Sequence, residues 1–93
     1  MVITKIDLNE LSQTIDCLFK ELSTKPTTSI DYHDWLFVAG KIRHTIHGRS
    51  VTSYHVVANN KVKPKCIEKR VETYKEIKMF LMTVVIIEAE EGS

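Results

Sequence analysis

One amphipathic stretch near the N-terminus constrains the fold of this chain more than any other part of the sequence. Aliphatic side chains recur there at spacings of three and four residues, which places them on one face of a helix: Leu8, Leu11, Ile15, Leu18 and Leu22. Asp7, followed by Glu10, resembles a capping box, in which an acidic side chain accepts hydrogen bonds from free backbone N–H groups. We therefore predict a helix over residues 7–22, ended by the Pro- and hydroxyl-rich residues 23–28.

The next stretch predicts a second helix that begins near Ser29 or Asp31 and ends at His47. Four apolar side chains form one stripe along it: Trp35, Val38, Ile42 and Ile46. Gly48 follows directly, and glycine is the residue that most readily takes the left-handed conformation ending a helix. Gly40 lies inside the stretch and disfavours the helix.

Residues 50–60 allow two interpretations. Ser50 is a suitable N-cap, and the apolar residues that follow it have helical spacing. The same segment is rich in β-branched and aromatic residues, which favour a strand. The two interpretations stay open at this point.

The C-terminal third allows two interpretations as well. One long amphipathic helix beginning after Pro64 fits the apolar spacing. The β-branched run 83–87 favours instead two paired strands, residues 66–72 and 78–87, joined across residues 73–77.

Charge is distributed unevenly along the chain, although the net charge is only +1. Residues 1–40 have a net charge of −3, residues 41–78 of +7, and the last fifteen residues of −3. Segregation of this kind is expected of a protein that contacts phosphates, although lysines and arginines also solvate exposed faces of proteins without that function.

The order of two helices, a short third element and a basic strand pair is that of a winged helix-turn-helix. The segment SVTSYHV, residues 50–56, resembles the recognition helix of winged-helix regulators of the ArsR and MarR type. IEKR, residues 67–70, resembles the segment that opens the first wing strand in those families. The length of the chain predicts one domain over residues 1–93. The resemblance, which covers roughly residues 33–86, implies an α+β, winged-helix-like fold in which N-terminal helices precede a short recognition helix and a β-hairpin wing.

The resemblance also implies a small, homodimeric transcriptional regulator that binds duplex DNA through helix 50–60 and a basic wing 61–78. The residues expected near bases and backbone are Arg49, Ser50, Ser53, Asn59 and Asn60. Those expected to contact phosphates are Lys61, Lys63, Lys65, Lys69, Arg70, Lys75 and Lys78.

The alternative fold is two helices plus an antiparallel β-meander. It accompanies an alternative function, a non-enzymatic protein-interaction module or inhibitor that acts through an apolar or aromatic surface. The candidate surfaces are the aromatic residues within 32–37 and the apolar run 79–87, which is also a candidate homodimer seam. A strand at 50–58 paired with 61–71 would favour this alternative.

Enzymes and metal proteins are not indicated. No set of acid, base and nucleophile can be named, so we expect neither catalysis nor a cofactor. His44 and His47 have a workable ligand spacing, and His55 with Cys66 could complete a site. The cysteine-rich knuckle of a zinc site is absent, so no metal is expected.

The chain is expected to be intracellular and cytoplasmic. Its two cysteines fit no disulfide framework, its first ten residues lack the pattern of a signal peptide, and no apolar run approaches the roughly 20 residues of a membrane span.

Overall fold

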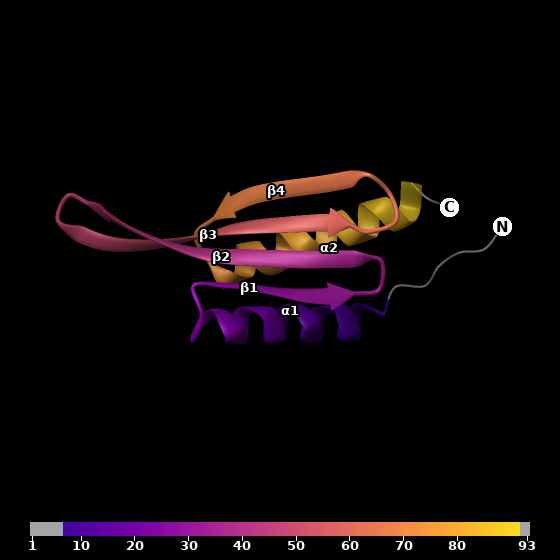
Figure 1. The fold of residues 1–93 in the computed structure, drawn as a ribbon, viewed down its shortest axis with the longest axis horizontal. Helices are drawn as coiled ribbons and strands as arrows, with labels where there is room; N and C mark the ends of the chain where they lie inside the picture. Colours follow the sequence, from indigo (N-terminus) through magenta and orange to yellow (C-terminus); the bar gives the residue numbers. More distant parts are fainter. Residues whose placement is uncertain (1–6, 92–93) are drawn as a thin grey trace.

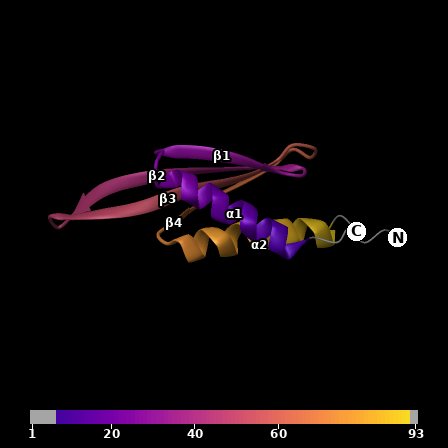
Figure 2. The same cartoon turned by 90° about the horizontal axis from the view of Figure 1, so that it is seen from below.

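The protein is an α+β structure in which the strands lie between the helices in the chain. The computed structural model describes residues 7–91, so the first six residues of the signal-peptide prediction lie outside the described residues. The elements are α1 (Leu8–Leu22), β1 (Thr27–Tyr32), β2 (Trp35–Ile46), β3 (Arg49–Asn60), β4 (Lys65–Val71) and α2 (Tyr74–Glu91). The strands form one antiparallel meander in the order β1-β2-β3-β4, and both helices lie on the same face of it (Figures 1 and 2).

Helix α1 confirms the first prediction. The carboxylate of Asp7 accepts hydrogen bonds from the backbone N–H groups of Asn9 and Glu10, at 3.0 and 3.1 Å. Four of the five predicted apolar side chains are buried: Leu11, Ile15, Leu18 and Leu22. Leu8, in the first turn, is 49% exposed.

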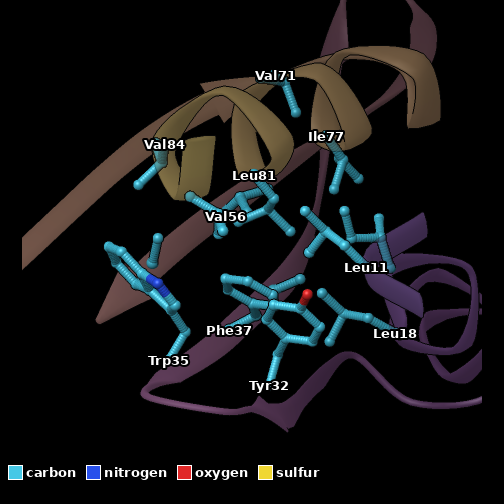
Figure 3. Close-up of a cluster of buried hydrophobic side chains, with 14 of the residues drawn as sticks. Leu11, Leu18, Tyr32, Trp35, Phe37, Val56, Val71, Ile77, Leu81 and Val84 are labelled. Carbon is cyan, nitrogen blue, oxygen red and sulfur yellow. The ribbon is translucent and has the colours of Figure 1, made fainter. Parts of the chain in front are cut away.

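The core is a single layer between the helices and one face of the sheet (Figure 3). Alternate residues of β2 point into it, namely Trp35, Phe37 and Ala39. Ile77 and Leu81 of α2 are fully buried against this face. Burying an aliphatic or aromatic side chain of this size contributes about 1.5–3 kcal/mol to folding, so this layer fixes the sheet and both helices together.

The helix predicted over residues 29–47 is wrong. These residues form β1 and β2, joined by a two-residue turn at His33 and Asp34. The four residues of the helical stripe divide between the two faces of the sheet, because Trp35 is buried whereas Val38 lies on the opposite face. Burial of alternate residues against the helices determines the conformation here.

The helix predicted over residues 50–60 is also wrong, and the strand interpretation is correct. β3 pairs with β2 over the full length of both strands, from Ile46↔Arg49 to Trp35↔Asn60. His47 has a φ of 52° and Gly48 a φ of 76°. Positive φ at both central residues is what a type I′ turn requires, and such turns match the twist of antiparallel strands. Gly48 therefore closes a hairpin and not a helix.

The predicted wing 61–78 divides into a strand and the start of a helix. β4 covers most of the first predicted strand, but residues 78–87 are helical. Thr73 caps the start of α2, because its hydroxyl accepts from the N–H of Glu76 at 3.2 Å and donates to the Glu76 carboxylate at 3.1 Å. Packing of Leu81, Val84 and Val85 against the core outweighs the strand preference of the β-branched run.

These corrections exclude the winged-helix layout, since no recognition helix precedes a wing. Residues 7–91 contain the antiparallel β-meander of the alternative but not a helix over residues 29–47, because one helix precedes the four strands and the other follows them.

Candidate nucleic-acid interface

The hairpin of β2 and β3 extends well beyond the rest of the sheet. The pairing of β1 with β2 ends at Gly40, and the pairing of β4 with β3 ends at Tyr54. Residues 41–53, here called the arm, therefore have no third strand beside them: Lys41 pairs with Tyr54, and residues 42–53 pair with each other. At about 3.4 Å per residue the arm projects roughly 20 Å past its neighbours. It makes the molecule 56 Å long but only 21 and 19 Å across (Figure 1).

The arm carries positive charge and contains no carboxylate. It contains Lys41, Arg43 and Arg49, together with His44 and His47, and no Asp or Glu. The whole segment 35–67 lacks acidic residues. With its histidines neutral the arm has a net charge of +3, which would attract a polyanion to its tip.

Register places these cations on both faces of the ribbon. Lys41 and Arg43 lie on the same face of β2 as the buried Trp35, because alternate residues of a strand share a face. Both lie beyond the end of the core, and Arg43 is exposed. The hydroxyl residues Ser50 and Thr52 lie opposite this row of alternate β2 residues on β3. Arg49 is exposed on the other face, beside Ile46. In the described residues, no carboxylate forms an ion pair with Lys41, Arg43 or Arg49.

Three lysines expected to contact phosphates lie at the opposite end of the sheet. Lys61, Lys63 and Lys65 belong to the β3–β4 connection and the start of β4. The twelve residues of β3 separate them from the tip of the arm by about 40 Å. One contact surface of modest size cannot include both groups.

Each of these lysines pairs with a carboxylate. Lys61 Nζ lies 3.0 Å from Asp31, and Lys63 and Lys65 lie 3.0 and 2.7 Å from the two oxygens of Glu88. Hydrogen bonds from Lys65 and Lys63 lower the pKa of Glu88, whose side chain is only 11% exposed. These contacts attach the β3–β4 connection to the last turns of α2, which is a structural role.

The polar residues of β3 have structural partners too. The amide oxygen of Asn60 accepts from the N–H groups of Val62 and Lys63, both at 2.9 Å, and so closes the β3–β4 connection. Asn59 is half-buried on the open face. Ser53 is 3% exposed and accepts a hydrogen bond from Arg70 Nε at 3.2 Å.

The remaining predicted residues lie near the base of the arm. Lys69 and Arg70 are exposed on β4, with Arg70 paired in register to His55. Lys75 is exposed in the first turn of α2, and Lys78 pairs with Asp16 at 3.2 Å. Of the predicted set, only Arg49, Ser50 and Ser53 belong to the arm itself.

Sequence reasoning missed Lys41 and Arg43, because it assigned them to a helix. Two signals in the sequence point to them. The dipeptide His47-Gly48 separates two runs of strand-forming residues, which is a hairpin signal. The acid-free segment 35–67 is centred close to that dipeptide.

The described residues contain no group of three or more His, Cys, Asp and Glu side chains that could hold a metal ion. His47 lies in the hairpin turn and His44 on the strand before it. Nε2 of His44 is enclosed and has no hydrogen-bond partner within residues 7–91. The aromatic residues proposed as a partner surface are mostly core, since Tyr32, Trp35 and Phe37 are buried.

Neither α1 nor α2, the helices of residues 7–91, is long and apolar enough to cross a membrane. Comparison with known proteins finds no matching protein-family model, no matching curated protein and no matching solved structure.

The ion pairs of Glu88 with Lys63 and Lys65 make the stability of the folded protein depend on pH in the acid range. A carboxylate with a lowered pKa stabilises the folded state above its ordinary pKa, and that stability disappears as the pH falls through the folded value. We expect Glu88→Gln to lower the urea midpoint of unfolding at pH 7. The wild-type midpoint should approach that of the variant below about pH 4, where an ordinary Glu is protonated. An equal difference between the two midpoints at pH 7 and at about pH 2.5 would contradict this role of the pKa.

Proposed function

We propose that the protein binds nucleic acid, specifically duplex DNA, by placing the arm in a groove of the helix. The observation that carries this proposal is the projecting β-ribbon with a net charge of +3 and no carboxylate. The major groove of B-DNA, about 12 Å wide, admits a two-stranded β-ribbon, and known β-ribbon readers use either groove.

The chemistry of the arm suits a phosphate-lined groove. Lys41, Arg43 and Arg49 supply cations whose binding to phosphates releases counterions. The hydroxyls of Thr45, Ser50 and Thr52 lie on the same face of the ribbon as Lys41 and Arg43. Hydroxyl side chains donate to phosphates and to base edges, so that face supplies both electrostatic and hydrogen-bonding contacts.

The proposal differs from the one based on the winged-helix resemblance. A recognition helix at 50–60 is excluded because these residues belong to β3, and a wing at 61–78 is excluded because α2 begins at Tyr74. A role in transcription regulation followed from that resemblance alone and is not part of this proposal. Binding to cellular DNA would place the protein inside the cell, and a cytoplasmic location remains part of the proposal.

Binding to a mixed-sequence duplex should depend on salt with a modest slope. Contacts from the three arm cations give a slope of about −3 in a plot of log affinity against log salt, because each phosphate contributes about −0.9. We expect Arg43→Ala with Arg49→Ala to reduce the slope to about −1, as measured by fluorescence anisotropy across a salt series.

The matched control is Lys25→Ala with Lys61→Ala, which removes the same charge from exposed positions outside the arm. The control should keep a slope near that of the wild type. If the two double variants reduced the salt slope equally, the arm would not be the binding site. Absence of DNA binding by the wild type at low salt would refute the proposed function.

A second candidate function is self-association, which the uncovered face of the sheet favours. The β-meander favours the interaction-module alternative by the criterion set from the sequence, although its aromatic residues are buried. Leu36, Val38 and Val57 lie on the uncovered face of the two central strands and are half-buried. Antiparallel sheets with one solvated face usually present polar residues there.

We propose a second copy of this chain as the occupant of that face. Two sheets pack face to face through such aliphatic side chains. Four strands about 4.8 Å apart and about 7 residues long present on the order of 450 Å² of flat area. That is below the roughly 800 Å² per partner of a standard interface, so the expected dimer is weak.

Sedimentation equilibrium across a concentration series tests the dimer. Val38→Asp should shift the population to monomer, because a carboxylate would be desolvated in the interface. Val62→Asp introduces the same charge at a position that is 72% exposed in the β3–β4 connection, and it should leave the association unchanged. A wild-type protein that remains monomeric at the highest concentration, or equal effects of the two variants, would contradict the proposal.

A further inference from the structure

The tip of the arm presents an apolar side chain beside a guanidinium. Ile46 and Arg49 are the last residues paired before the turn, so their side chains lie on the same face. Ile46 is 46% exposed and Arg49 is exposed. The tip is the part of the described chain farthest from both helices (Figures 1 and 2).

The tip is also held in one conformation. Pairing between β2 and β3 is unbroken from the core to Ile46↔Arg49, and the two-residue turn at His47 and Gly48 closes it with positive φ at both positions. A two-residue turn of this kind leaves the chain little freedom to reorient the last pair. An exposed isoleucine held in this way can insert into a neighbouring molecule while the tip of the hairpin keeps its conformation.

We propose that Ile46 acts as a wedge that enters between two base pairs from the minor groove, so that the protein bends the DNA it binds. This inference rests on the proposed function and adds an activity to it. Apolar side chains inserted between base steps unstack them and kink the duplex by about 20–90°. Arg49 beside the wedge supplies the cation that the negative potential of the minor groove attracts.

The wedge predicts which sequences are preferred. Pyrimidine–purine steps such as TA and CA unstack most easily, so a duplex with such a step at its centre should bind more tightly than one without it. The preference would arise from deformation of the duplex and would need no base contact from the arm.

The test is a bending measurement on a duplex of about 30 base pairs with a central TA step, labelled at its two ends for resonance energy transfer. Wild-type protein should raise transfer between the ends on binding. Ile46→Ala should lose most of that rise while affinity, measured by anisotropy on the same duplex, falls by less than about tenfold. Ile46→Phe, which keeps an apolar wedge, should retain the bend.

Ile42→Ala is the matched control, because Ile42 lies on the same face of the same strand and is 36% exposed, but four residues from the tip pair. It should bend DNA as the wild type does. Binding without any bend, or a bend that Ile46→Ala leaves intact, would overturn the wedge and leave the proposed function standing. Absence of binding by the wild type would instead refute the proposed function.

Discussion

The pairing of β2 with β3 is the interaction on which the rest of the structure depends. These two twelve-residue strands form the centre of the sheet, and each carries one edge strand on its outer side. Their covered face supplies Phe37, Ala39 and Val56, which are fully buried under the helices. The same backbone pairing, continued without interruption, forms the arm.

The two strands therefore have two different environments along their length. On β2 the covered row begins with Trp35, Phe37 and Ala39 and continues with Lys41 and Arg43. The change from apolar to basic residues occurs after Gly40, where β2 stops pairing with β1 and the core ends. Along this row of β2, charged residues, which cost free energy if buried without partners, occur only beyond that point. The core anchors the hairpin, and the arm presents the charge.

Part of this structure followed from the sequence for clear physical reasons. The sequence of α1 contains both the apolar spacing of a helix and an N-cap residue, so this helix was predicted correctly. The stripe from Trp35 to Ile46 satisfies a helical spacing and also contains the alternation of a strand, and only burial against the helices distinguishes the two. The run 83–87 has strand preference but becomes helical because its neighbours pack into the core.

The site was predictable only in part. The net charge of +7 over residues 41–78 indicated a cationic region, but not that the sheet would divide it. Register sends Lys61, Lys63 and Lys65 to the end opposite Arg43 and Arg49, where they pair with carboxylates from distant segments. Such partners, Asp31 and Glu88, lie more than twenty residues away in sequence, so local patterns carry no information about them.

The most direct test of this account is to map the DNA contacts residue by residue with amide chemical shifts. A short duplex would be titrated into isotopically labelled protein at low salt. Binding through the arm predicts the largest shifts over residues 41–53, with small shifts over residues 61–65 at the far end of β3. Large shifts over residues 61–65, with the arm unaffected, would contradict the assignment of binding to the arm.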